Sequence, residues 1–473
     1  MANLRVRAPR IDFSALRREL DLPGEFPPEA MRQAEQAARR SAELAGALPD
    51  RTDIDFVTID PPDSLDLDQA VCIVKRGSGY RVHYAIADVA SFVPAAGPLD
   101  QETWSRGQTI YFPDDRVPLH PLVLSEDAAS LLPGKVRPAV LWSIDLDAHG
   151  EQTGVTVQRA AVRSRAKLDY AGVQQAVDAG NPPDPVALLP EVGRLRLEWS
   201  EQRDAVNLPL PEQEITSHGD GWRLELRAPH PVEEHNAQIS LLTGMAAAQM
   251  MLEGGFGLLR TLPSAAEKDL SRVRAAARAL GVEWPDGARV GEVIAQLDPA
   301  APRGAAALDV VAELLRGSGY TSFDGAPPER PEHAGAGAPY AHVTAPLRRL
   351  PDRYATEVCL AFHDGREVPT EIRDAVPKLP EAISASDRRA GEAERAAVDL
   401  TEAVLLADRV GQVFDAAVID VNGDANRATV TLEDPPVRAR CEGEALTPGE
   451  RVRVRLVEAD PTQRRVRFVV ADV

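Results

Sequence analysis

One short stretch, TIDPPDSLDLDQA at residues 58–70, constrains this chain more than any other part of it. It holds four aspartates within nine residues. Two like charges about 4 Å apart repel by roughly 1 kcal/mol in water and by roughly 4 kcal/mol at an effective dielectric of about 20. The cluster therefore has to be solvated or neutralised by a cation. The preceding run DFVTI is β-branched and aromatic, and the two prolines after it exclude a helix, so we expect a strand that ends at the aspartates.

The spacing of the last aspartates indicates a ligand site. Asp66 and Asp68 alternate with two leucines, so in an extended segment both carboxylates point to one side. Such oxygens suit an octahedral Mg²⁺ that keeps several waters and borrows phosphate oxygens from a substrate, and phosphodiester hydrolysis is the chemistry such ions serve. An exposed acidic loop and a calcium loop stay open as alternatives, although the glycine and the closing glutamate of a calcium loop are missing.

Composition limits the class of protein. A chain of 473 residues with 44% hydrophobic content can form one large core and one or two small domains. No run of eighteen apolar residues occurs and the N-terminus lacks the apolar core of a signal peptide, so we expect a cytoplasmic protein without a membrane segment. The net charge of −20 argues against indiscriminate wrapping of nucleic acid, because phosphate affinity comes mainly from Lys and Arg. Any nucleic-acid contact has to be local.

The three cysteines, Cys72, Cys359 and Cys441, are far apart and match no metal-binding spacing. We expect them to be buried as small hydrophobic residues, with neither a disulfide nor a zinc site.

Four regions follow from the local patterns. Residues 1–50 contain two predicted helices, 13–21 and 28–46, which are interpreted either as a contact of helix-turn-helix type or as a packing appendage. Residues 51–375 alternate β-rich runs, proline turns and helices, which is typical of an α+β domain, and residues 376–410 are dominated by one long polar helix. Residues 411–473 alternate short strands with turns, which predicts an OB-like barrel.

The barrel also carries a basic pattern. The run RVRVRLV places Arg451, Arg453 and Arg455 on one face of a strand. This face is interpreted as a contact for a nucleic-acid backbone or as an ordinary solvated face.

The aspartate stretch resembles the signature of the RNB family, the ribonuclease II and ribonuclease R exoribonucleases. HYAIADV, SRGQTIYFPDDRVPLHP, LSEDAASLLP and VTAPLRRLPDRY resemble further stretches of that family, in the same order between Asp53 and Phe362. The resemblance implies an RNB catalytic domain at 51–375 and an RNA-binding domain of S1 type at 411–473. It also implies a hydrolytic 3′→5′ exoribonuclease that degrades single-stranded RNA to nucleoside 5′-monophosphates, and we expect a monomer.

The resemblance assigns roles to single residues. Asp60, Asp66, Asp68 and Gln69 would hold one or two Mg²⁺ ions, with Asp68 the most sensitive position. The family motif ends in two adjacent aspartates, whereas this chain has Gln69 after Asp68, which removes one charge and leaves the second metal open. An aspartate at position 69 is expected to raise activity or to lower the Mg²⁺ requirement. Arg348 would contact the scissile phosphate, since a guanidinium matches phosphate oxygens in two-pronged fashion.

Two further residues would hold the RNA. Tyr170 matches the tyrosine that stacks on the 3′-terminal base, and Glu394 lies where the family has a glutamate that contacts the 3′ end. The opposite aromatic jaw of the family, in the loop after GFGLLRTLP, has no counterpart here. Two alternatives stay open: the clamp is one-sided, or Phe256 shifts to serve as the second jaw.

Two rival functions stay open at this point. Gln69 and the missing jaw also fit a catalytically weakened RNA-binding protein with the same groove and barrel. A DNA exonuclease is the third alternative, because only contact with the 2′-hydroxyl separates RNA from DNA.

Overall fold

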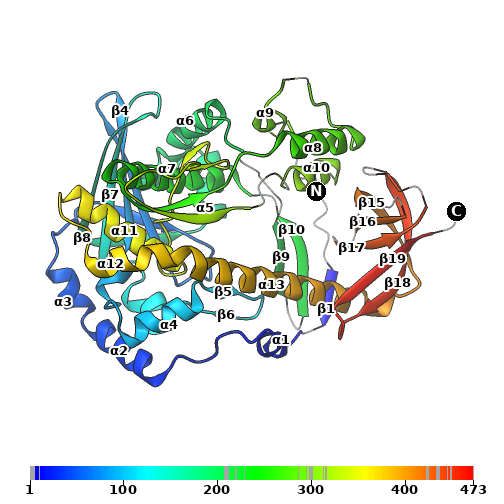
Figure 1. Ribbon diagram of the computed structural model, residues 1–473, viewed down its shortest axis with the longest axis horizontal. Helices are drawn as coiled ribbons and strands as arrows, with labels where there is room; N and C mark the ends of the chain where they lie inside the picture. The colour runs from blue at the N-terminus through cyan, green and yellow to red at the C-terminus, as the bar shows by residue number, and fades with distance from the viewer. Residues whose placement is uncertain are drawn as a thin grey trace.

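The computed structural model describes residues 6–9, 11–206, 212–218, 221–227, 229–285, 287–294, 296–297, 302–312, 314, 317–421, 426–432, 437–444, 446–447 and 450–471. Figure 1 shows an α+β body on one side and a small β-barrel on the other. The long helix α13 (Leu379–Leu406) runs from the body to the barrel. A fold of α+β class with a C-terminal barrel is therefore confirmed.

The body is built around a closed barrel with the strand order β2-β3-β4-β7-β8. Its strands are β2 (Phe56–Ile59), β3 (Gln69–Arg76), β4 (Gly79–Ala87), β7 (Val136–Leu146) and β8 (Gln152–Leu168). β2 runs parallel to β8, and the other described pairs are antiparallel. The strand expected before the aspartates is β2, which places the aspartate stretch between β2 and β3.

Both faces of these strands are covered. Successive residues of a strand point to opposite sides, and Val71 and Tyr84 accordingly join the core cluster that includes α7 (Pro231–Gly254) and α11 (Leu350–His363). Cys72 and Ala85 join a second cluster that includes α2 (Pro28–Arg39). The barrel thus forms the centre of the core, and helices far apart in sequence are fixed against it.

The remaining elements surround this core. The other helices are α1 (Ser14–Glu19), α3 (Ser41–Gly46), α4 (Pro98–Arg106), α5 (Tyr170–Asp178), α6 (Leu189–Gln202), α8 (Glu267–Ala279), α9 (Val290–Ile294), α10 (Pro302–Ala312) and α12 (Thr370–Ala375). Short helical turns span Val89–Ser91, Leu124–Ala128, Asp184–Val186, Val376–Lys378 and Ala407–Arg409. Small sheets are formed by β1 (Val6–Pro9), β10 (Gly221–Arg227) and β9 (Glu212–His218), by β5 (Ile110–Tyr111) and β6 (Arg116–Val117), by β11 (Phe256–Thr261) and β12 (Gly319–Asp324), and by β13 (Glu332–His333) and β14 (Ala338–Pro339).

The N-terminal helices pack onto the body. Ala30 and Ala34 of α2 are fully buried in the cluster that also contains Leu124 and Ala128. The predicted single helix 28–46 is interrupted at Arg40 and forms α2 and α3. Eight residues, 20–27, separate α1 from α2, whereas a helix-turn-helix has a turn of three to four residues. This arrangement favours the interpretation of these helices as a packing appendage.

The C-terminal barrel closes with the strand order β15-β16-β17-β19-β18. Its strands are β15 (Val413–Val421), β16 (Arg427–Leu432), β17 (Arg438–Glu442), β18 (Arg451–Asp460) and β19 (Arg465–Val470). Leu405 and Leu406 at the end of α13 share a core cluster with Phe468 of β19 and Phe13 near α1. The barrel is therefore anchored to the long helix by apolar packing.

Cys72, Cys359 and Cys441 are buried and free, as predicted. Within the described part of the chain, no helix combines the length and the apolarity needed to cross a membrane.

Candidate functional site

The aspartate loop between β2 and β3 is tied down at several points. Lys167 of β8 donates from Nζ to the carbonyl oxygen of Ser64 at 2.6 Å. Ser130 donates from Oγ to the carbonyl oxygen of Leu65 at 2.6 Å and accepts from the backbone N–H of Leu67 at 3.0 Å. The backbone of the loop is thus held in place by partners outside it.

Asp68 meets the segment that carries Arg348. Its Oδ1 accepts from the backbone N–H of Leu347 at 2.7 Å, and its Oδ2 lies 3.5 Å from Nε of Arg348. The Asp68 side chain is 6% exposed and the Arg348 side chain 46%. Burial raises the pKa of Asp68 to about 8, although Arg348 opposes this shift. A buried carboxyl group therefore lies beside a guanidinium that reaches solvent.

Asp60 and Asp66 form the second part of the site. Burial, together with the nearby Asp66 charge, raises the pKa of Asp60 to about 6, although Lys167 and Arg348 oppose this shift. Asp66 accepts from the hydroxyl of Tyr111 at 2.9 Å through Oδ2. A divalent cation would stabilise the ionised form of both carboxyl groups, because it offsets their mutual repulsion in this partly buried place.

A complete cage of protein ligands is not found. No group of three or more His, Cys, Asp or Glu side chains in the described ranges is arranged to hold a metal ion. Mg²⁺ does not need such a cage, since it is usually held by one or two carboxylates together with waters and substrate phosphates. Asp60 and Asp66 fit that requirement, and the participation of Asp68 as a third ligand stays a prediction.

Gln69, the fourth predicted ligand, is engaged by protein partners. Its Oε1 accepts from the hydroxyl of Tyr84 at 2.7 Å, and its Nε2 donates to the carbonyl oxygen of Thr344 at 2.6 Å. Both ends of the amide are therefore used inside the protein.

Tyr170 lies at the edge of the same site. It opens α5, where Asp169 caps the helix by accepting from the N–H of Gly172 at 2.8 Å. Its hydroxyl accepts from Nδ2 of Asn236 at 3.3 Å. Burial raises the pKa of Tyr170 to about 12, and the charge of Asp60 contributes to the shift. The tyrosine is thus within electrostatic reach of the aspartate loop.

Phe256 is buried in the core, and the exposed aromatic bonded to the aspartate loop is Tyr111. Phe256 is 2% exposed and lies under the guanidinium of Arg373, 4.5 Å from the ring centroid, so it cannot turn toward a substrate without breaking the core. Tyr111 is 49% exposed, and its hydroxyl is bonded to Asp66. Tyr111 lies in the stretch SRGQTIYFPDDRVPLHP, where its position in a predicted strand gives no signal that the ring is exposed.

The two neighbouring arginines differ in role. Arg349 is bonded to the fully buried Asp352, with its NH2 group 2.8 Å from Oδ2, whereas Arg348 projects outward. The α13 carboxylate that approaches this segment is Asp387, which accepts from Nε2 of Gln108 at 2.9 Å, and Gln108 forms a backbone bridge with Arg349. Glu394 is exposed on α13 and its contact with RNA stays a prediction.

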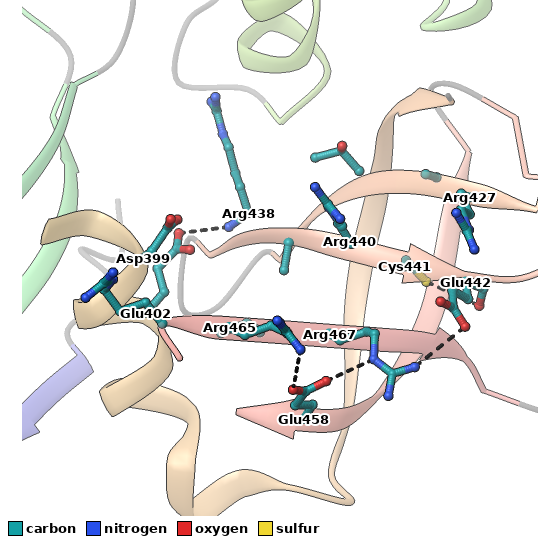
Figure 2. A pocket seen from close by; sticks show the side chains of 15 residues that line it. Asp399, Glu402, Arg427, Arg438, Arg440, Cys441, Glu442, Glu458, Arg465 and Arg467 are labelled. Carbon is teal, nitrogen blue, oxygen red and sulfur yellow. Dashed lines mark hydrogen bonds and ion pairs between the residues drawn. The ribbon is translucent and has the colours of Figure 1, made fainter. Parts of the chain in front are cut away.

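A second candidate site lies on the C-terminal barrel. A cavity of about 960 Å³ opens between the barrel strands and the end of α13. Six arginines and four acidic side chains line it, and Figure 2 shows most of them. The arginines are Arg427, Arg438, Arg440, Arg464, Arg465 and Arg467, and the acids are Asp399, Glu402, Glu442 and Glu458.

The acidic side chains form ion pairs with some of these arginines. Nε of Arg467 lies 3.1 Å from Glu458 and its NH1 lies 3.6 Å from Glu442. Arg440 is next to Arg467 because β17 and β19 pair in parallel. For the guanidinium groups of Arg427 and Arg440, no hydrogen bond or ion pair is found with any other residue that the structure describes. Both side chains line the cavity.

The arginines predicted from the RVRVRLV pattern lie on β18. Arg451, Arg453 and Arg455 are all exposed, so their alternation is as expected. Arg453 pairs across the strands with Asp415, and NH1 of Arg455 donates to the carbonyl oxygen of Gly411 at 3.2 Å. Their contact with RNA stays a prediction.

Comparison with known proteins finds two matching family models. A family model described as the RNB domain matches residues 49–362, more than half of the chain, and one described as the RNase II-type exonuclease C-terminal S1 domain matches residues 412–471. Ribonuclease R of Escherichia coli is 29% identical over 399 residues, which cover 79% of this chain and 49% of that protein. The chain thus spans about half the length of the curated relatives it matches first.

Solved structures show the same fold. The chain is similar to Mycoplasma genitalium RNase R in complex with ribose methylated single-stranded RNA, with a TM-score of 0.85 and 18% identity, covering 97% of this chain and 77% of that one. It is also similar to yeast Ssd1, described as a pseudonuclease, with a TM-score of 0.67 and 16% identity, covering 90% of this chain and 53% of that one.

Proposed function

Because this chain belongs to the RNB domain family, we propose that it is a hydrolytic 3′→5′ exoribonuclease that degrades single-stranded RNA to nucleoside 5′-monophosphates with Mg²⁺. The observation that carries the proposal is the meeting of Asp68 with Leu347 and Arg348 at the end of the aspartate loop. A carboxyl group that can bind a cation and a solvent-reaching guanidinium at one place are what binding of a phosphate beside a cation requires.

The proposed roles follow from the contacts. Asp60, Asp66 and Asp68 would hold Mg²⁺, which when bound supplies activation of water and neutralises phosphate charge. Arg348 binds the scissile phosphate, and Asp68 orients the guanidinium of Arg348. Tyr170 and Tyr111 hold the 3′-terminal bases, since stacking on aromatic rings tolerates any base.

The organisation of the chain is part of the same proposal. We divide it into a helical region at 1–50, the RNB catalytic domain at 51–375, the long helix at 376–410 and the S1-type domain at 411–473. The helix α13 and the barrel strands from Val413 to Val470 support the last two divisions.

The direct test is incubation of the purified chain with 5′-labelled single-stranded RNA and Mg²⁺, with and without a chelator. We expect stepwise shortening from the 3′ end, release of nucleoside 5′-monophosphates, and no shortening with the chelator. An oligomer with deoxyribose at its 3′ end separates an RNA enzyme from a DNA enzyme. RNA that is bound and left intact in Mg²⁺ would contradict the proposal.

That last outcome is the one expected of the rival function. An RNA-binding protein without activity is favoured by the absence of a carboxylate at position 69, where Gln69 stands. The similar fold of yeast Ssd1, a pseudonuclease by its description, shows only that the fold itself does not decide between the two functions.

We further propose that the RNA backbone crosses the barrel over β16 and β17, where Arg427 and Arg440 line the cavity of Figure 2. Replacing both by glutamine is expected to weaken RNA binding by about ten-fold and to reduce the salt slope of log Kd by about 1.4, since each of the two phosphate contacts on a single strand contributes about 0.7. Titration of a fluorescent oligomer at several salt concentrations, with a chelator present, measures both.

The matched control removes the same charge from another face of the barrel. Replacing Arg451 and Arg453 by glutamine changes the net charge equally, and we expect a smaller effect because Asp415 faces Arg453 across the strands. If the β18 pair weakens binding more, the contact lies on β18, as the pattern RVRVRLV alone suggests.

A further inference from the structure

The amide of Gln69 connects two parts of the catalytic body. Gln69 opens β3 on the same face as Val71, which is paired with Tyr84 of β4. Tyr84 is 1% exposed and donates its hydroxyl to Oε1 of Gln69 at 2.7 Å. On the other side, Nε2 of Gln69 donates to the carbonyl oxygen of Thr344 at 2.6 Å. A buried strand is thereby tied to the segment that leads into Arg348.

That segment is fixed by hydrogen bonds at several of its residues. Oγ1 of Thr344 lies 2.8 Å from Oγ of Ser240 on α7. The backbone N–H of Ala345 donates to Asp352 at 2.7 Å, and that of Leu347 donates to Asp68 at 2.7 Å. The long Arg348 side chain starts from a backbone that these bonds place, so their loss would change where the guanidinium lies.

The glutamine amide can make both hydrogen bonds at position 69, and a carboxylate cannot. An amide both donates and accepts, whereas a carboxylate only accepts. An aspartate at position 69 could accept from Tyr84 but could not donate to Thr344, and a buried carbonyl would face a negative charge without a partner. The uncharged Gln69 therefore completes the chain of hydrogen bonds from Tyr84 to Thr344.

We propose that Gln69 and Tyr84 are positioning residues for Arg348, and that Gln69 acts through the 344–348 segment rather than as a metal ligand. The inference rests on the proposed exoribonuclease activity. It also reverses the expectation for an aspartate at position 69, which should now lower activity.

The kinetic test compares Tyr84→Phe, Gln69→Met and the double variant. Each single variant is expected to lower kcat by about ten-fold, because small misplacement of a catalytic group costs between one and two orders of magnitude. KM and the Mg²⁺ concentration for half-maximal rate should stay within about two-fold. The double variant should be no slower than the slower single variant, since both changes break one chain of bonds.

Tyr80→Phe is the matched control. Tyr80 also lies on β4, is 3% exposed and donates its hydroxyl to Glu191 at 2.5 Å, far along the strand from Gln69. Tyr80→Phe removes a hydroxyl group of the same kind from the same strand, and kcat should not change.

A second measurement needs no activity. Hydrogen exchange of peptides that cover residues 343–349, followed by mass spectrometry with a chelator present, reports on the segment directly. Exchange should be at least about five-fold faster in Tyr84→Phe and Gln69→Met, as loss of one net hydrogen bond allows, and unchanged in Tyr80→Phe. If the wild-type chain does not degrade RNA, the proposed function fails while this measurement still decides the positioning role.

Two outcomes would overturn the inference. One is a ten-fold or larger increase in the Mg²⁺ requirement of Gln69→Met with no effect of Tyr84→Phe, which would make Gln69 a metal ligand. The other is a Gln69→Asp variant with raised kcat and unchanged exchange of the 343–349 peptides. A variant Gln69→Asp with lower kcat and faster exchange supports the positioning role.

Discussion

Replacing Asp68 by asparagine is expected to slow RNA degradation by at least roughly 10²–10³-fold, the range for losing one preorganised electrostatic group, with RNA binding intact. Asparagine keeps an acceptor for the N–H of Leu347, so the 2.7 Å hydrogen bond can persist. The other oxygen, 3.5 Å from Nε of Arg348, is replaced by an amide group that cannot neutralise the guanidinium or hold a cation. The change therefore removes charge and preserves shape.

Single-turnover degradation of a labelled oligomer measures the rate, and titration with a chelator present measures the binding. Asp63→Asn is the matched control, because Asp63 belongs to the same aspartate stretch but is exposed, and its rate should be unchanged. Retained turnover by Asp68→Asn would remove Asp68 from the proposed mechanism.

The second large effect is expected at Arg348. Arg348→Ala should lower kcat by roughly 10²–10³-fold, because it removes a cation aimed at charge that develops on the phosphate. Arg348→Lys should recover only part of this rate, since an ammonium is a point charge that cannot bind two phosphate oxygens in parallel. The side chain is 46% exposed, so neither change should lower stability appreciably.

Arg349, the neighbour of Arg348, is expected to affect stability and serves as the comparison. It is bonded to Asp352, which is fully buried, and Arg349→Lys should lower the melting temperature because a buried charge loses its two-pronged partner. Thermal unfolding and kcat, measured on the variants of both positions, separate the roles. Equal loss of stability in Arg348→Ala and Arg349→Lys would show that Arg348 is structural.

Much of the fold could be predicted because its signals are local. The run DFVTI and the prolines after it predict a strand that stops at the aspartates, and β2 ends at Ile59. The alternation in RVRVRLV predicts an exposed row on β18, and its arginines are exposed. Each signal depends on a few neighbouring residues, whose backbone preferences and side-chain periodicity act within one strand or helix.

The tertiary structure decided what these elements bring together. Leu347 binds Asp68 across 279 positions of sequence, and the amide of Gln69 turns to Thr344 rather than to the aspartates. The exposed aromatic bonded to Asp66 is Tyr111, whereas Phe256 is buried under Arg373. Such contacts depend on which strands and loops meet, and no local pattern contains that information.

The basic cavity on the barrel shows the same division. The alternation of charged and apolar residues along each strand can be read from the sequence. Arg440 lies beside Arg467 only because β17 and β19 pair in parallel. The amino-acid sequence by itself determined which residues form strands, helices and the aspartate loop, since those depend on short-range preferences. Long-range pairing and burial determined which carboxylate meets which guanidinium, since the free energy of those contacts exists only once distant segments are packed against each other.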